Sequence, residues 1–131
     1  MSPEIAARIP GAPEFIAWFG RVPRFHDGSV LEFALDLSRR GHLKVKTFRM
    51  NPDTDENGYF RLDKHCVVTF HFEEVAVADL AFEDDAEIID DITIKAHDDG
   101  FVMEITAING FDAMLQMKTL RLAFEPDETA R

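Results

Sequence analysis

The chain is poor in cysteine, tryptophan and tyrosine and has no long hydrophobic run, and each shortage excludes a class of protein. Among 131 residues there are 1 Cys, 1 Trp and 1 Tyr. Cys66 alone can form neither an internal disulfide nor a thiolate metal site, which agrees with a reducing compartment. No apolar run approaches the roughly 20 residues that span a bilayer, and MSPEIAARIP does not resemble a secretory signal. We therefore expect a cytoplasmic protein without membrane association.

Basic residues are scarce as well, with 14 Lys and Arg against 25 Asp and Glu, a formal net charge of -11. Nucleic acid is excluded as an expected partner, because phosphate backbones are bound by clustered Lys and Arg. The three serines, Ser2, Ser29 and Ser38, lie in no G-x-S-x-G pattern, and no glycine-rich nucleotide motif occurs. The sequence therefore predicts no cofactor and gives no indication of hydrolase or nucleotide chemistry.

Apolar residues are abundant, at 46% of the chain, and 12 of them are Phe. A chain of this length fits one domain with a single core, so we expect one domain over residues 1–131 with a phenylalanine-rich interior. The prolines and glycine of residues 1–12 disfavour a helix there, and we expect residues 1–12 and 126–131 to be loosely ordered. A short helix is predicted from Pro13, because Phe15, Ile16 and Phe19 share one face and Gly20 is a stop signal.

After Gly28 the apolar period changes to two, which is typical of strands with one buried face. The first predicted strand has an inward set of Leu31, Phe33, Leu35 and Leu37. The RRGH turn, with Gly41 able to take a positive φ, leads into a return strand over 43–50. The third strand, 65–73, is predicted to bury Cys66, Val68, Phe70 and Phe72.

Further strands are predicted over 74–82, 89–96, 101–108 and 115–124. The turn HDDG joins 89–96 to 101–108, with Ile92 and Ile94 facing Met103 and Ile105. In the last strand the apolar positions change phase, which indicates a bulge or twist near Lys118. The predicted fold class is α+β, mainly an antiparallel sheet (a curled sheet, sandwich or open barrel) with one short N-terminal helix.

His26-Asp27 is the first candidate site. The pair could serve as a base with its orienting carboxylate or as two metal ligands, although both uses require further groups from elsewhere. The structural alternative is that Asp27 accepts backbone N–H bonds across a turn allowed by Gly28, while His26 is held by a backbone or carboxylate partner. A metal-dependent enzyme using His26 and Asp27 is the less favoured hypothesis.

The segment from Asp53 to Gly58 matches the start of a calcium loop, D-x-D-x-N-G. Such loops end in a bidentate Glu at their twelfth position, and here that position is Lys64. The flanking segments are predicted strands, whereas calcium loops of this type join helices. We therefore interpret the segment as a polar loop in which Asp and Asn stabilise turns, and predict no metal site.

A dense acidic segment, residues 83–91, is the candidate binding surface. Its carboxylates produce a negative field that could steer a basic partner into contact. The alternative is that these residues only keep the protein soluble. The residues of the hypothesised surface are Glu83, Asp84, Asp85, Glu87, Asp90 and Asp91.

One segment supports a family resemblance. Trp18, Gly20, Pro23 and then Phe25-His26-Asp27-Gly28 resemble the opening signature of the bacterial family called immunity protein fifty, found near polymorphic toxins. The resemblance implies a β-rich domain of about this length that neutralises a toxin by binding it, without catalysis. In this reading the motif residues are structural: they fix the helix to the first strand, with Phe25 in the core.

Together these observations predict a non-catalytic protein-binding domain, an immunity protein whose cognate bacterial toxin is a basic domain. The alternative is an acidic housekeeping interaction module of the same fold, or a homodimer.

Overall fold

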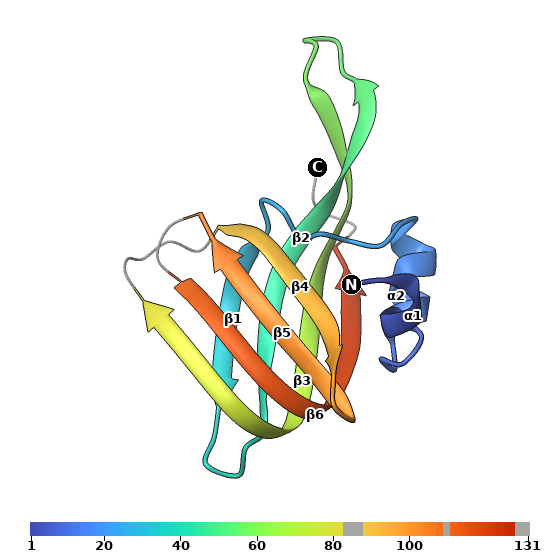
Figure 1. Ribbon diagram of the computed structural model, residues 1–131. Coiled ribbons are helices and arrows are strands. Elements are labelled where there is room, and N and C mark those ends of the chain that lie inside the picture. Colours follow the sequence, from blue (N-terminus) through green and yellow to red (C-terminus); the bar gives the residue numbers. More distant parts are fainter. Residues whose placement is uncertain (83–87, 109–110, 128–131) are drawn as a thin grey trace.

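The computed structural model describes residues 1–82, 88–108 and 111–127, and in these ranges two short helices precede six strands (Figure 1). The strands form one antiparallel sheet in the order β1-β2-β3-β6-β5-β4. The predicted fold class, α+β with a mainly antiparallel sheet, is confirmed. The elements are α1 (Pro3–Ala6), α2 (Ala12–Phe19), β1 (Ser29–Leu35), β2 (Gly41–Thr54), β3 (Phe60–Phe82), β4 (Ile89–His97), β5 (Gly100–Ala107) and β6 (Phe111–Pro126).

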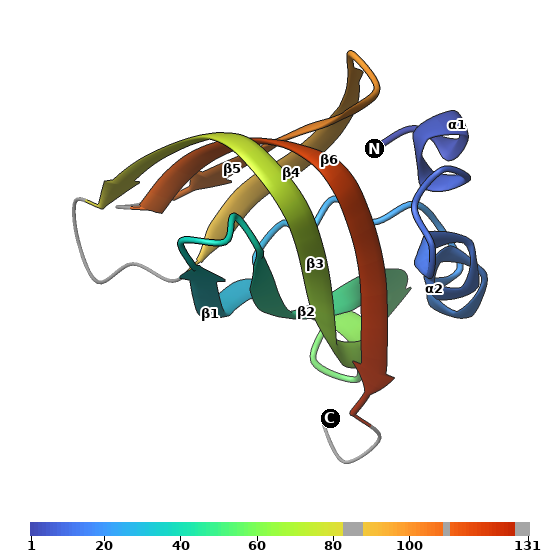
Figure 2. The same ribbon diagram turned by 90° about the horizontal axis from the view of Figure 1, so that it is seen from below.

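The sheet arches strongly, so that its two edge strands, β1 and β4, approach each other (Figure 2). They meet at one point, where the N–H of Asp27 donates to the carbonyl of Ile89 over 2.9 Å and the N–H of Ile89 donates to Gly28 over 2.8 Å. A single bridge, between Ser29 and Ile88, continues this contact. The result is a curled, open sheet rather than a closed barrel.

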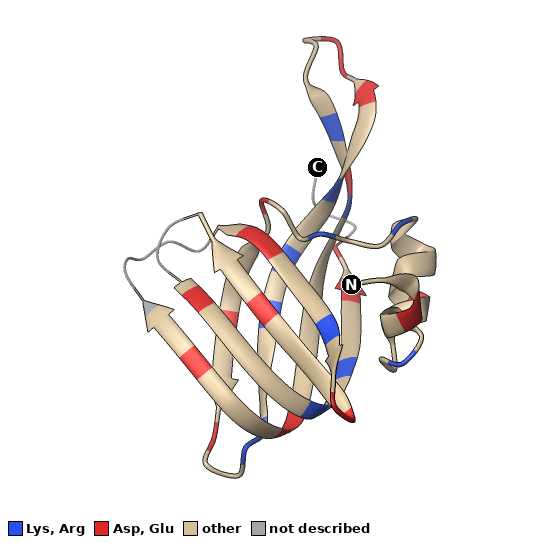
Figure 3. Ribbon diagram, in the orientation of Figure 1, with Lys and Arg blue, Asp and Glu red and all other residues tan. Residues whose placement is uncertain are grey.

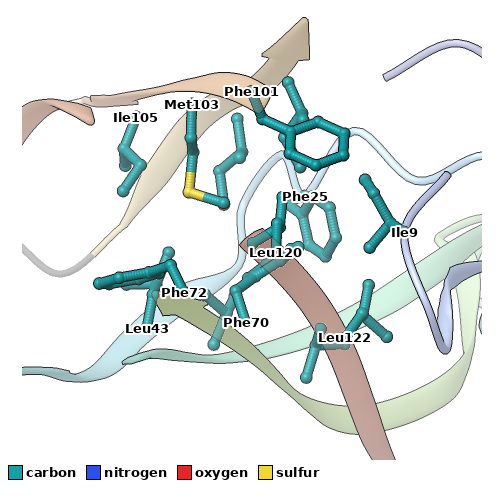
Figure 4. Packing of buried hydrophobic residues seen from close by; sticks show 14 of the residues in the cluster. Ile9, Phe25, Leu43, Phe70, Phe72, Phe101, Met103, Ile105, Leu120 and Leu122 are labelled. Atoms are coloured by element: carbon teal, nitrogen blue, oxygen red, sulfur yellow. The ribbon is translucent and has the colours of Figure 1, made fainter. Parts of the chain in front are cut away.

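The core fills the inside of the arch (Figure 4). All four residues predicted to face inward on the third strand are fully buried: Cys66, Val68, Phe70 and Phe72. The predicted hairpin is also confirmed, since Ile92 pairs with Ile105 and Ile94 pairs with Met103. Each large apolar side chain removed from water in this way contributes about 1.5–3 kcal/mol.

The helices cover the end of the arch beside β6. On α2, which ends at Gly20 as predicted, the ring of Phe15 lies 5.1 Å from that of Phe124. The loop before α2 is bonded to the sheet by Leu122, whose N–H donates to Pro10 over 2.8 Å. Gly11 permits this approach, because its φ is +90° and a Cβ there would lie 1.7 Å from the Leu122 carbonyl oxygen.

The N-terminal segment differs from the expectation of a loosely ordered, non-helical start. Residues 3–6 form α1, which is capped by the Ser2 side chain accepting from the N–H of Ile5 over 3.2 Å. Ala6 and Ile9 are buried in the core. Proline at the first helical position suits a helix start, so the prolines did not prevent this short turn.

The first strand differs from its predicted alternation. A register shift between Val30 and Glu32 changes the facing of the strand, so that Leu31 is 49% exposed. Phe33 and Leu35 pack against the core as predicted, whereas Leu37 lies beyond the end of β1 and is fully exposed. A bulge of this kind shifts the period-two pattern by one residue.

The turn between β1 and β2 was also predicted incorrectly in detail. The positive φ belongs to Arg39, at 65°, and not to Gly41, which begins β2. Gly41 is required for a different reason: a Cβ there would lie 2.0 Å from the carbonyl oxygen of Ala34 and 2.7 Å from the ring of Phe72.

Residues 60–82, predicted as parts of two strands, form the single long strand β3. It accommodates its length with a register shift between Val75 and Val77 against β6. On β6 the phase of burial changes as predicted, because Lys118 and the next residue, Thr119, are both exposed.

The polar segment after Asn51 is a hairpin rather than a loop. Strands β2 and β3 continue beyond the sheet as a two-stranded ribbon, residues 49–63, which projects from the body (Figure 1). Its turn is closed by Asp55, whose side chain accepts from the N–H groups of Asn57 and Tyr59. Neither β1 nor β6 extends along the ribbon, so its two edges are not paired with these neighbouring strands.

Candidate functional site

The motif segment joins α2 to the sheet, as the resemblance implied. Trp18 lies on α2 with its ring 5.3 Å from that of Phe124, and the ammonium group of Lys64 lies 5.0 Å from the indole centroid. Gly20 ends the helix with a φ of 95°, and Pro23 is buried. These three residues are therefore part of the packing between helix and sheet.

Phe25 and Asp27 both have positive φ, 64° and 66°, whereas Gly28 does not. The prediction that Gly28 provides the turn was therefore wrong. Phe25 is in the core, with its ring 5.4 Å from that of Phe70, as predicted. Asp27 contributes its main-chain N–H to Ile89, and its carboxylate accepts no backbone N–H within the described residues. The expected capping role of the carboxylate is thus absent, and the turn is fixed by the meeting of the sheet edges.

His26 is held by a backbone partner, as predicted. Its Nδ1 lies 2.9 Å from the carbonyl of Asp90, and because a carbonyl can only accept, this nitrogen carries the proton. Its Nε2 lies 3.7 Å from the Asp27 carboxylate. Within the described ranges no group of three His, Cys, Asp or Glu side chains is placed to hold a metal ion.

A cavity of about 270 Å³ lies beside the motif, between residues 19–27 and β2. Its apolar walls come from Phe19, Val22, Phe25, Phe48 and Met50. Its polar rim consists of Arg21, Arg24, His26 and Asp27. Arg24 forms no hydrogen bond or ion pair with any described residue, whereas Arg21 donates to the carbonyl of Met50 over 3.1 Å. In a strongly acidic chain this is a local cationic site over an apolar floor.

The hypothesised acidic surface is described only in part. Glu83, Asp84, Asp85 and Glu87 lie outside the described residues. Asp90 and Asp91 follow Ile89 at the start of β4. Asp90 is exposed, and its main-chain carbonyl accepts from His26, while Asp91 pairs with Thr106.

The structure places Asp91 among acids that are distant in sequence. Asp79 on β3 pairs with Met114, and Met114 pairs with Glu104 on β5. Asp112 on β6 pairs with Ala81, two residues after Asp79 on β3, and borders the same shallow surface as Asp79 and Glu104. Ile92, Ile105 and Ala113, next to the acids of β4, β5 and β6, are buried, and Leu80, next to Asp79, packs against the core, so the four carboxylates share the outer face. We call Asp79, Asp91, Glu104 and Asp112 the acidic face (Figure 3).

None of these four side chains forms an ion pair with a described residue. The neighbouring base on β4 is Lys95, which pairs with Val102, two residues before Glu104 on β5. Sequence reasoning missed Asp79, Glu104 and Asp112 as members of one surface. The alternation of each strand could have placed these residues on its outer side, but the sequence did not predict that β3 pairs with β6.

Away from the acidic face, the outer sheet carries histidines and residues of both charges. His42, His71 and Arg121 are directly paired across β2, β3 and β6. The hydrogen bond between His42 and Glu32, 2.6 Å long, holds the pKa of Glu32 below its usual range. Burial, followed by the charge of Arg121, lowers the pKa of His71. Of the three paired residues only Arg121 is a permanent cation, so this end of the outer face is mixed in charge, unlike the acidic face.

The base of the ribbon is held by a bidentate ion pair. Arg49 donates to both carboxylate oxygens of Asp63, over 2.8 and 2.7 Å, and also to the carbonyl of Phe19 over 3.1 Å. These hydrogen bonds from Arg49 lower the pKa of Asp63. The ribbon is thereby fixed to the end of α2.

Neither Cys66 nor the calcium-like segment supplies a reactive site. Burial raises the pKa of the Cys66 thiol to about 11, so this sulfur remains protonated near neutral pH. The calcium-like segment is the ribbon turn, flanked by strands as predicted, and Lys64 follows in β3.

No protein-family model, curated protein or solved structure matches this chain. Among the described helices, none has the length and apolar character needed to cross a membrane.

Proposed function

We propose that the chain is a non-catalytic protein-binding domain whose acidic face receives a basic partner. The observation that carries the proposal is the convergence of Asp79, Asp91, Glu104 and Asp112 from four strands onto one outer surface, where none of them forms an ion pair with a described residue. Unpaired carboxylates that face solvent together repel each other, and an opposing cationic surface relieves that repulsion.

The specific form of the proposal is an immunity protein of the cytoplasm that neutralises a basic toxin. It is supported by the resemblance of the Trp18–Gly28 segment, by the formal net charge of -11 and by the single, buried cysteine. An acidic inhibitor associates rapidly with a cationic enzyme because long-range attraction steers the encounter.

The test replaces Asp79 and Asp91 by Asn and Glu104 by Gln in one variant. The association rate constant with the product of the neighbouring gene is measured at low and at physiological salt. We expect the variant to associate roughly tenfold more slowly at low salt and to show a flatter salt dependence. Protection of cells that express the neighbouring product gives the functional readout.

The control variant removes the same amount of charge from elsewhere, with Glu4→Gln, Glu14→Gln and Asp98→Asn. These positions are exposed and lie on α1, α2 and the β4–β5 turn. Equal slowing in both variants would show that only net charge matters and would reject the acidic face. Absence of any complex or protection would reject the immunity proposal itself.

A further inference from the structure

The ribbon exposes large apolar side chains on one of its faces. Met50 and Leu62 are cross-strand partners and therefore share a face, and Phe60 lies two residues before Leu62 on the same side of β3. Their exposed fractions are 41%, 42% and 59%, and the neighbouring Tyr59 is 70% exposed. We call Met50, Phe60 and Leu62, which share this face, the ribbon patch. A two-stranded ribbon that leaves such residues in water is only marginally stable by itself.

The ribbon patch is continuous with the cavity beside the motif. Met50 belongs to both, and Phe48, two residues earlier on β2, lines the cavity wall. One surface therefore runs from the cavity, at the base of the ribbon, to Phe60 beside the ribbon tip.

Opposite charges mark the two ends of this surface. The tip carries Asp53, Asp55 and Glu56, while the cavity rim carries Arg21 and Arg24 (Figure 3). The ring nitrogens of His26 at the rim lie 3.7 Å from the Asp27 carboxylate and 3.6 Å from the Asp90 carboxylate, so the rim's cationic character comes from the arginines. The surface is thus acidic and aromatic at one end, and cationic and concave at the other.

We propose that this surface binds a second copy of the chain, with the two ribbons antiparallel about a twofold axis. Such an interface must be self-complementary, because the same patch is used by both subunits. Reversing one ribbon places its acidic, aromatic tip over the cationic cavity of its partner, and the reverse contact forms at the same time. The steps from Met50 to Thr54 span about 13 Å at roughly 3.3 Å per residue, which sets the offset between tip and cavity.

Phe60→Asp is the first test, with Leu37→Asp as its control. Both residues are exposed, but Leu37 lies in the β1–β2 turn, remote from the ribbon patch in the chain. Sedimentation across a range of concentrations at about 0.15 M salt keeps the repulsion between two acidic chains screened. We expect a dimer whose Kd rises at least tenfold with Phe60→Asp, since each residue acts twice, and is unchanged with Leu37→Asp.

A charge exchange tests the orientation. Glu56→Lys and Arg24→Glu should each weaken the dimer, and the two together should restore it, because the pair is then reversed across the interface. In addition, Glu56→Cys and Arg24→Cys chains, mixed under oxidising conditions, should form a disulfide-linked pair, whereas Glu56→Cys mixed with Arg8→Cys should not. The native Cys66 does not interfere, because it is buried.

A chain that remains monomeric at every concentration tested would overturn the proposal. So would a dimer that tolerates Phe60→Asp, or one that is weakened by both charge reversals and is not restored by their combination. Melting curves of the variants are the control that checks whether the exposed substitutions leave the fold intact.

Discussion

Strand β3 passes through two regions, the body and the ribbon, that differ in how far its apolar side chains are buried. In the body its alternate apolar residues, from Cys66 to Phe72, are fully buried, whereas in the ribbon Phe60 and Leu62 are largely exposed. The strand conformation is the same in both. The difference lies in what faces the strand: the arch, the helices and the β4–β5 hairpin cover the body, and no described element covers the ribbon patch. Alternation determines the side of a residue, and a second layer determines its burial.

The largest expected effect separates the two regions directly. Phe70→Ala should lower the free energy of unfolding by about 3–5 kcal/mol, because a fully enclosed ring leaves a cavity. Phe60→Ala should change the stability of the monomer by no more than about 0.5 kcal/mol. Denaturant unfolding at a low protein concentration measures both, and equal losses would show that the ribbon is packed as tightly as the body.

A smaller effect is expected where the edges of the body meet. Asp27 has a φ of 66°, a conformation that costs a β-branched residue more than Asp or Asn. Asp27→Val should therefore destabilise the fold by ~1–2 kcal/mol, and Asp27→Asn should have little effect. Thermal melts of the two variants make the comparison. A large loss for Asp27→Asn would instead assign the stabilisation to the carboxylate charge.

The smallest effect concerns the base of the ribbon. Because Arg49 lowers the pKa of Asp63 in the folded chain, their interaction stabilises the fold above the unfolded pKa of Asp and is lost as pH falls through the lower, folded value. An NMR titration should therefore give Asp63 a midpoint below about 3.9, the ordinary Asp value. Asp63→Asn should remove this acid dependence at the ribbon while leaving the body's amide signals unchanged. A midpoint at the ordinary value would mean that the ion pair does not persist in solution.

Local patterns in the sequence predicted much of the body. The helix after Pro13, the inward set of β3 and the β4–β5 hairpin each depend on neighbouring residues, and all were confirmed. The errors arose where geometry overrode a residue preference. The positive φ expected of Gly41 and Gly28 is found instead at Arg39 and Asp27. Gly41 is needed for the close approach of the Ala34 carbonyl, and not for its φ.

The candidate surfaces were harder to predict, because they depend on strand order. Asp79 and Glu104 become neighbours of the same residue, Met114, only because β3 pairs with β6 rather than with β4. The ribbon patch was hidden for another reason: the polar residues 51–58 predicted a loop, whereas β2 and β3 continue into it as paired strands. Neither the sheet order nor the length of a hairpin follows from composition or period.

The pairing of β3 with β6 also has a consequence for how the chain folds. Four antiparallel contacts, β1–β2, β2–β3, β4–β5 and β5–β6, join strands that are neighbours in sequence. The β3–β6 ladder, which joins Cys66 to Pro126 at one end and Phe82 to Phe111 at the other, forms around the whole β4–β5 hairpin. Its closure has the highest entropic cost, because it must bring two preformed units together across a long stretch of chain. We expect this docking step to limit the folding rate, with the two local units assembled before it.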